Sequence, residues 1–565
     1  FNVDIFKNDE NGGMIMTILF KCDKVIRSMK NKIVKKGERK SMKKRKYLAL
    51  LLAAGMIAQT ALSTGGVVQV QAAEDTYVKT DELTDNDTAA PKKDSVIPSK
   101  NQYEYQKQEL AAFCHFGMNT YTGSEWGNGK ENPNQFQLTN DFDEETYVKA
   151  IHDAGFKKLI ITAKHHDGFC IWPSEMTTHD TETAGYEGDV LEELSRACTK
   201  YNIDMGLYLS PWDVNSEYYG YKDKDGKKLV GADGQPLNGK TWDQVKQEDA
   251  LDYNEYYDNQ LKEILGNDKY GNNGHFKEVW MDGAKDTNDK SNAQDYDFQR
   301  WFKTIQQYEG KASGKYEDDC LLFGAESYTT VRWIGNERGY AAEETWAKST
   351  IDRENNTINS NSRDGYTKGF PNGNQWTVEA DTKITSGWFW GESKKTPLSM
   401  EQLAGIYFGS VGHNATLLLN VPPNKQGTVD ADILARVAEF GKAVQNTFDK
   451  NLAEKASVSA TEVRGNSKKY SPENLLDGND ETYWTVGDGT TSGKVLIDLG
   501  ESKKFDVVSI EEAIQFGQRI GSFKVEYKNG NGEWKTFDQG TTIGAKRLCR
   551  KKAVKADKLR ITVTA

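Results

Sequence analysis

The chain has 565 residues, a net charge of −11 and 37% hydrophobic residues, and it contains 13 Trp. This length exceeds that of one small domain, so two or three folded units are expected. The acidic balance argues against nucleic acid as a partner, because phosphate binding requires a basic surface. The many Trp residues are consistent with large cores or with flat rings that hold sugars.

The N-terminal region contains a predicted secretion signal. The basic residues of 42–47 precede an apolar run over 48–62 and a small-residue cleavage site at 70–72, which are the three parts of a signal peptide. We assign 42–73 to this signal and interpret 1–41 as upstream translation without a structural role. Polar residues interrupt the apolar run, whereas a membrane anchor needs about 18 apolar residues. We therefore expect a secreted or cell-surface protein with no membrane span after cleavage.

Residues 74–100 are polar and are interpreted as a linker, and residues 101–450 alternate apolar strands with amphipathic helices. The predicted strands cover 110–118, 158–163, 204–210, 277–282, 320–324 and 415–421. The predicted helices cover 144–154, 191–201, 250–265, 297–308, 400–411 and 430–448. This alternation indicates parallel strands joined by crossover helices, and its length favours a (β/α)8 barrel. Residues 325–398 are expected to form loops over the barrel mouth, with one or two strands.

The pattern changes after residue 450. Alternating strands appear at 494–498, 522–527 and 558–563, and 529–532 has the composition of a hairpin turn. This predicts an antiparallel β-sandwich over residues 451–565. The cysteines beyond the signal show no framework or zinc spacing and are predicted to be buried thiols.

Polar side chains follow the predicted barrel strands, at the end where such barrels carry catalytic residues. Asp282 ends the strand 277–282, and a buried carboxylate is costly without partners or a function. The other strand ends and their loops supply His115, Glu125, Trp126, His165, His166, Tyr208 and Trp280. The His pair could bind a metal or be structural. Because the neighbouring residues are Trp and Tyr, we favour contacts to a sugar.

Glycoside hydrolysis needs a second carboxyl group across the scissile bond from the first. Two glutamates are candidates. Glu326 directly follows the strand 320–324, whereas Glu337 lies near Trp333, whose apolar wall would favour the protonated form of a general acid. From position alone, either could also be an ordinary solvated loop carboxylate.

Several motifs together resemble the α-L-fucosidases of glycoside hydrolase family 29 over about residues 101–450. They are His115-Phe-Gly-Met, Glu125-Trp, Lys164-His-His-Asp-Gly-Phe, Leu207-Tyr-Leu-Ser-Pro-Trp, Trp280-Met-Asp-Gly and Gly387-Trp-Phe-Trp. The resemblance implies a retaining exo-α-L-fucosidase with Asp282 as nucleophile and no cofactor for catalysis. Residues 331–337 are similar to the acid/base segment of the branch that cleaves α-1,3/1,4-linked fucose from Lewis-type glycans. This similarity favours Glu337 as the acid/base, with Glu326 as the alternative.

The resemblance also implies which residues contact the sugar. The family's fucose-binding residues map onto His115, Glu125, Trp126, His165, His166, Tyr208, Trp280 and Trp388. The expected partners are fucosylated glycans, free or attached to protein. Two other functions stay open: a catalytically inactive surface lectin or adhesin, and a barrel glycosidase that acts on another sugar.

The C-terminal region resembles a discoidin or F5/8 type C module. The loop 474–484 corresponds to a segment that often holds a structural Ca²⁺ in such modules, which would make Asp477 and Asp480 ligands. The alternative is a turn without an ion. The sandwich could bind sugar or support the barrel, and support is our expectation.

Overall fold

The computed structural model describes residues 2–6, 75–285, 289–310, 319–324, 326–352, 357–358, 367–370, 373 and 376–565. The predicted signal peptide lies outside these residues, so secretion stays a prediction. Strand β1 (Asn2–Phe6) pairs with the C-terminal sheet, although we predicted no structural role for residues 1–41. No helix of the described segments is long and apolar enough to cross a membrane.

Eight parallel strands form a nearly closed barrel. They are β3 (Leu110–Cys114), β4 (Lys158–Lys164), β5 (Asp204–Leu209), β6 (Glu278–Trp280), β7 (Leu321–Phe323), β8 (Arg332–Trp333), β11 (Val378–Lys383) and β12 (Thr416–Asn420). The hydrogen-bonded order is β7-β6-β5-β4-β3-β12-β11-β8, and one parallel bridge between Phe323 and Val331 joins the two ends. The predicted barrel is confirmed.

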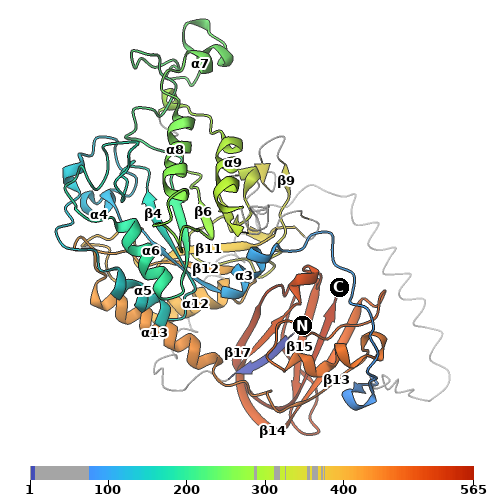
Figure 1. The fold of residues 1–565 in the computed structure, drawn as a ribbon. Coiled ribbons are helices and arrows are strands. Elements are labelled where there is room, and N and C mark those ends of the chain that lie inside the picture. The colour runs from blue at the N-terminus through green and yellow to red at the C-terminus, as the bar shows by residue number, and fades with distance from the viewer. Residues whose placement is uncertain are drawn as a thin grey trace, which may run out of the picture. The chain divides into compact units, whose positions relative to one another are not determined.

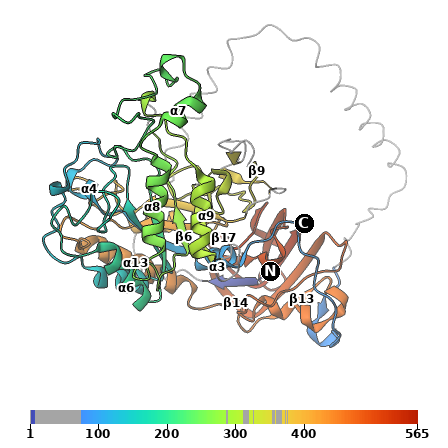
Figure 2. The ribbon, with the colours of Figure 1, turned by 45° about the horizontal axis from the view of Figure 1, so that its top comes forward.

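Crossover helices lie outside the strands (Figures 1 and 2). They are α5 (Glu144–Asp153), α6 (Val190–Lys200), α8 (Tyr253–Leu265), α9 (Phe298–Glu309), α12 (Met400–Ser410) and α13 (Ala431–Phe448). Each lies within a few residues of its predicted range. In α6, Asp189 caps the first turn by accepting from the backbone N–H of Glu192, and Leu191 and Leu194 face the core. In the described part of the chain, no α-helix directly follows β7 or β8, and only a short 3-10 helix, η5 (Glu326–Tyr328), lies between these two strands.

Shorter elements precede the first barrel strand or lie in the loops of the barrel. They are α3 (Lys100–Gln108), α4 (Met118–Thr122), α7 (Trp242–Glu248), β9 (Ile351–Asp352) and β10 (Thr357–Ile358). The predicted helix 250–265 begins at Tyr253, and α7 is a separate helix before it. Figure 1 shows α7 at the tip of a projection above α8.

The C-terminal domain is an antiparallel sheet. Its strands are β13 (Ser457–Ala460), β14 (Ser492–Glu511), β15 (Ser522–Lys528), β16 (Lys535–Gly540) and β17 (Arg547–Thr564), with β1 and β2 (Val78–Lys79) added. The predicted turn at 529–532 falls between β15 and β16. The segment 74–100, which we interpreted as a linker, contributes β2 and accepts a hydrogen bond from Arg464 at the carbonyl of Ala89.

An ion cluster joins this sheet to the barrel. Lys107 Nζ lies 2.8 Å from Glu511 Oε2, and Lys546 lies 3.0 Å from Glu511 and also pairs with Glu109. Burial raises the pKa of Glu511, but the ammonium groups of Lys546 and Lys107 outweigh it and lower the pKa to about 2. Because Glu109 directly precedes β3, the cluster lies at the amino ends of the strands. The sheet domain therefore contacts the barrel at that end, and its supporting role stays a prediction.

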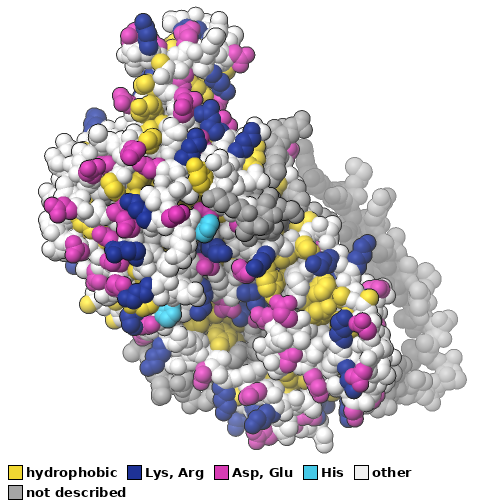
Figure 3. Space-filling model, in the orientation of Figure 1, with side chains coloured by type: hydrophobic (Ala, Val, Ile, Leu, Met, Phe, Trp, Pro, Cys, Tyr) yellow, Lys and Arg dark blue, Asp and Glu magenta, His cyan; other side chains and the backbone are white. Residues whose placement is uncertain are grey.

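Acidic and basic side chains are interspersed over the face of the molecule seen in Figure 3. Nucleic-acid binding would call for a basic stripe or patch, and the exclusion of that partner stays a prediction from the sequence. Cys114, Cys170, Cys198, Cys320 and Cys549 are free and buried, which confirms their predicted character.

A buried polar layer fills the inside of the barrel. Lys158 Nζ lies 2.8 Å from Glu278 Oε2 and 3.6 Å from the ring centroid of Tyr105, with both charged side chains at most 1% exposed. Tyr105 in turn donates to Glu379, which also accepts from Trp280 Nε1 at 3.0 Å. Strand β6 is thus anchored through Glu278 at its first residue, and Asp282 follows two residues after its last.

Replacing Lys158 should test this anchor. Lys158→Met leaves the Glu278 carboxylate buried without its cation, so the free energy of unfolding should fall by about 3–5 kcal/mol. Urea denaturation at pH 7 measures the loss. The double variant Lys158→Met/Glu278→Gln removes both charges and should recover most of it. A loss below about 1 kcal/mol, or no recovery in the double variant, would contradict the anchoring role.

Candidate active site

A cavity of about 420 Å³ lies at the carboxyl ends of the barrel strands, within the size range of small-molecule sites. Its wall includes Asp282 and Glu337. It also includes all eight residues predicted to contact substrate: His115, Glu125, Trp126, His165, His166, Tyr208, Trp280 and Trp388. Residues from six strands or their following loops therefore meet in one place, as the sequence predicted.

The Asp282 carboxylate is held by hydrogen bonds to both oxygens. The Tyr208 hydroxyl donates to Oδ2 at 3.2 Å, and the backbone N–H of Ala284 donates to Oδ1 at 2.8 Å. His166 Nε2 lies 3.7 Å from Oδ2. The side chain keeps 29% of its surface exposed in the cavity. These contacts orient the carboxylate while leaving it accessible to a ligand.

The three histidines of the cavity are buried and neutral. Burial lowers the pKa of His115 to about 3 and that of His165 well below its ordinary value. Burial also lowers the pKa of His166, although the nearby Asp282 acts in the opposite direction. Neutral imidazoles offer one donor and one acceptor each, which suits the hydroxyl groups of a sugar.

Aromatic rings form the walls of the cavity. Trp280 stacks on Phe323 with ring centroids 3.9 Å apart and on Tyr208 at 5.2 Å. Trp388 lies 4.9 Å from His115, while Trp126 is 59% exposed. Flat apolar walls beside neutral polar groups favour a ligand with both C–H faces and hydroxyls.

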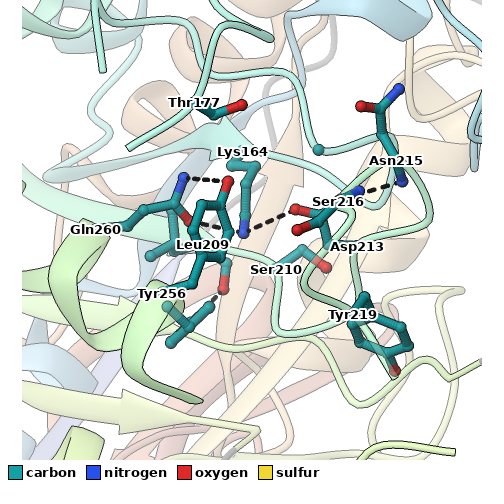
Figure 4. A network of polar contacts seen from close by, with 12 residues as sticks. Lys164, Thr177, Leu209, Ser210, Asp213, Asn215, Ser216, Tyr219, Tyr256 and Gln260 are labelled. Carbon is teal, nitrogen blue, oxygen red and sulfur yellow. Dashed lines mark hydrogen bonds and ion pairs between the residues drawn. The ribbon is translucent and has the colours of Figure 1, made fainter. Parts of the chain in front are cut away.

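A network behind the double-histidine motif fixes its strand (Figure 4). Lys164 Nζ contacts Asp213 Oδ2 at 3.3 Å and Gln260 Oε1 at 2.8 Å, with no exposed side-chain surface. A Cβ on Gly168 would lie 2.3 Å from Asp213 Oδ1, and its φ of +77° also favours glycine. The 164–168 motif therefore combines ligand-facing histidines with residues needed for packing.

Glu337 is surrounded differently from our expectation. Its Oε2 accepts from Lys383 Nζ at 3.2 Å and from Trp388 Nε1 at 3.1 Å, and the side chain is 52% exposed. The indole of Trp333, predicted as an apolar wall for this carboxyl, instead donates to Asp381 Oδ1 at 2.8 Å. An indole N–H needs a partner when it is buried, and Asp381 supplies one.

Glu326 begins the short helix η5 (Glu326–Tyr328). Its side chain lies outside the described residues, so the structure does not compare it with Glu337.

Asp381 is a cavity residue that the sequence analysis missed. It lies in β11, and its side chain is 3% exposed and lines the cavity. Burial raises its pKa to about 7, with Glu337 and Asp282 adding to the rise and Trp333 opposing it. The sequence could have indicated this residue. Glu379 and Asp381 are two residues apart in Val378-Glu-Ala-Asp, so in a strand their side chains lie on the same face.

The carboxylates of the predicted calcium loop have protein partners. Asp480 pairs with Lys107 at 3.0 Å, and Asp477 accepts from the Asn479 backbone and from Thr482 Oγ1 at 2.9 and 2.6 Å. These partners satisfy the two groups without an ion, so their chemistry does not require calcium there. Calcium binding by this loop stays a prediction.

Within the described residues, one group of three histidine, cysteine or acidic side chains could hold a metal ion: His165, His166 and Asp282. The ligand atoms lie within 4.8 Å of one another. Two imidazoles and a carboxylate would suit a zinc-type ion. The aromatic walls and the second carboxyl at the same cavity instead have the composition of a sugar-cleaving site.

A parallel barrel that gathers carboxylates, neutral imidazoles and indoles at its strand ends has the features of a glycoside hydrolase. Comparisons with known proteins then identify the family. Residues 76–447 match the alpha-L-fucosidase family, and residues 455–565 match the F5/8 type C domain. The chain belongs to the α-L-fucosidases of glycoside hydrolase family 29, and it is an α-L-fucosidase that acts on fucose-containing substrates.

Individual relatives cover most of the chain. The structure of a family 29 fucosidase from Ruminococcus gnavus in complex with fucose is 59% identical, covers 87% of this chain and 96% of its own, and has a TM-score of 0.81. Alpha-L-fucosidase 1 of Arabidopsis thaliana is 37% identical over 460 residues, which are 80% of this chain and 81% of that protein. The lectin and other-sugar alternatives are therefore set aside.

The raised pKa of Asp381 predicts a pH dependence of stability. The carboxyl is protonated in the folded state up to about pH 7 but only to about pH 3.8 when unfolded. The Asp381 carboxyl therefore contributes fully to the free energy of unfolding below pH 3.8. This contribution, about 4 kcal/mol, is lost as the pH rises through 7. Asp381→Asn should remove this slope.

Unfolding free energies of wild type and Asp381→Asn, compared from pH 4 to pH 8, measure this effect. The variant should gain stability relative to wild type as the pH rises. Trp333→Phe is the matched control. It removes the indole N–H that lowers the pKa of Asp381, so the loss of stability with rising pH should extend to higher pH than in wild type. Parallel pH profiles for wild type and Asp381→Asn would contradict the assignment.

Proposed function

We propose that this α-L-fucosidase is a retaining exo-enzyme with Asp282 as nucleophile and Glu337 as acid/base. The observation that carries the proposal is the position of Asp282. It follows β6, is oriented by Tyr208 and Ala284, and shares one cavity with Glu337. The cavity lies at one end of the barrel, and a pocket there suits a terminal sugar.

The reaction takes two displacements. Asp282 attacks the anomeric carbon while Glu337 gives its proton to the departing glycosidic oxygen, which leaves a covalent fucosyl-enzyme. Glu337 then takes a proton from water, whose oxygen attacks the same carbon and releases Asp282. Two inversions give α-fucose as the first product. The step needs no oxidant, reductant or further reactant.

Glu337 is the acid/base that we favour among three carboxyls. Its side chain faces the cavity and remains half exposed, so it can exchange protons with water during the second step. Glu326 is the sequence alternative. Asp381 is a further candidate because it lines the cavity and is protonated near neutral pH, but its burial and its bond to Trp333 restrict its access to water.

Three matched variants separate these candidates. Glu337→Gln should slow hydrolysis of natural fucosides by at least about a hundredfold, but slow aryl fucosides much less, because a phenolate leaves without a proton. Azide added to this variant should yield α-fucosyl azide. Glu326→Gln and Asp381→Asn should show neither this selective slowing nor the azide product. If one of these two variants shows both, its residue is the acid/base in place of Glu337.

Asp282→Ala should abolish turnover of every fucoside while the protein stays folded. Proton NMR of the wild-type reaction should show α-fucose before mutarotation. Release of β-fucose first, or residual turnover by Asp282→Ala above about 1% of wild type, would contradict the proposed double displacement.

We further propose a preference for α-1,3/1,4-linked fucose of Lewis-type glycans. Support comes from residues 331–337, which resemble the acid/base segment of that branch, and from the exposed Trp126 at the cavity. An exposed indole offers a flat surface to the sugar that leaves.

Hydrolysis of Lewis-a and Lewis-x trisaccharides should be compared with that of 2′-fucosyllactose. The expected kcat/KM is at least about tenfold higher for the two Lewis trisaccharides, a difference of about 1.4 kcal/mol in transition-state binding. Equal rates, or faster cleavage of 2′-fucosyllactose, would contradict the linkage preference and leave the fucosidase activity itself unaffected.

A further inference from the structure

Each of the three cavity histidines uses its Nδ1 atom for a contact with the protein. The partners are Asn420 for His115, Asn119 for His165 and Ser210 for His166. No Nε2 atom of these rings has a hydrogen-bond partner in the described part of the chain, apart from the 3.7 Å approach of His166 to Asp282. A neutral imidazole carries one proton, so the partner of Nδ1 decides what Nε2 can do.

His115 must carry its proton on Nδ1. Asn420 Oδ1 accepts from the backbone N–H of His115 at 3.2 Å, and Asn420 Nδ2 donates to the carbonyl of Trp388 at 2.7 Å. These two bonds fix which end of the amide is oxygen. The oxygen lies 2.9 Å from His115 Nδ1, and two acceptors cannot bond to each other. His115 therefore presents an unprotonated Nε2.

His165 must carry its proton on Nε2. Asn119 Nδ2 donates to the carbonyl of Glu125 at 3.1 Å, which fixes the amide in the opposite sense. The same nitrogen lies 3.3 Å from His165 Nδ1, which accepts its second proton. Rotating the amide by half a turn would place Asn119 Oδ1 against the carbonyl oxygen of Glu125. The amide keeps this sense although its buried Oδ1 lacks a partner among the described residues.

His166 carries its proton on Nδ1, as His115 does. Ser210 Oγ lies 2.6 Å from the carbonyl of Trp212, which can only accept, so the hydroxyl proton is used there. Ser210 Oγ is then the acceptor for His166 Nδ1 at 2.7 Å. The unprotonated Nε2 faces Asp282, so that two acceptors lie side by side. A ligand hydroxyl that enters between them must donate its proton.

We propose that Asn420, Asn119 and Ser210 are positioning residues that fix the proton on each cavity histidine. The cavity then presents an acceptor at His115, a donor at His165 and an acceptor at His166 to the hydroxyls of bound fucose. This inference rests on the proposed sugar-contacting role of the histidines. It adds a reason for selectivity, because a ligand must match the order of donor and acceptor as well as the shape.

The proton positions can be read directly by NMR. Two-bond ¹H–¹⁵N spectra of protein labelled with ¹⁵N-histidine distinguish protonated from unprotonated ring nitrogens. The seven histidines are assigned with His→Gln variants, and no ligand is added. At pH 7 we expect Nδ1–H for His115 and His166 and Nε2–H for His165. Any other pattern in the wild-type protein overturns the proposal.

Ser210→Ala and Ser210→Thr form a matched pair. The alanine variant loses the acceptor for His166, so part of the His166 population should move its proton to Nε2. The kcat/KM for a fucoside should fall by roughly tenfold, the loss expected for one hydrogen bond to substrate. The threonine variant keeps the hydroxyl and should keep the wild-type proton pattern and most of the activity.

Asn119→Ala is a second, independent variant in case Ser210→Ala does not fold. Removing the donor should release the His165 proton to either nitrogen, with a similar loss in kcat/KM. Near-UV circular dichroism confirms folding of each variant. Unchanged proton patterns in folded alanine variants would overturn the positioning role. The spectra need no turnover, so they test the proton positions separately from the reaction. If the spectra show the expected pattern but the enzyme does not retain configuration, only the proposed reaction is rejected.

Discussion

The carboxyl ends of parallel strands in this barrel meet at one rim, and the rest of the site depends on that constraint. Strands β3 to β8 and β11, with the loops that follow them, contribute residues separated by up to about 270 positions in the sequence to a single cavity. The register of β6 is held from below by the buried Lys158–Glu278 pair. That pair fixes where β6 begins, and Asp282 emerges at the rim a short distance further along.

The polar groups around the cavity form two layers with different tasks. The inner layer consists of neutral imidazoles, indoles and carboxyls that face the ligand. The outer layer, which includes Asn119, Asn420 and Ser210, has no access to the ligand but decides the orientation and proton position of the inner one. Such support is what allows a polar site to exist inside a barrel, since buried polar groups are costly when they lack partners.

The sequence predicted the barrel and most of the cavity, and the reasons are physical. Buried parallel strands are continuous apolar runs that end at polar residues, so β3 to β6 and their His, Tyr, Trp and Asp ends were visible. Strand β11 was not, because Glu379 and Asp381 interrupt its apolar pattern, and both carboxyls are buried only through partners from other strands. The partners of these side chains could not be predicted from the sequence either. Trp333 donates to Asp381, and Glu337 accepts from Lys383 and Trp388.

In the proposed double displacement, Asp282 becomes covalently attached to fucose. Incubation with 2-deoxy-2-fluoro-fucosyl fluoride, which slows the second displacement, should trap the intermediate, and peptide mass spectrometry should locate it. We expect a single 2-deoxy-2-fluorofucosyl adduct on Asp282, absent from Asp282→Ala. An adduct on another carboxylate, or inactivation of turnover without any covalent adduct, would contradict it.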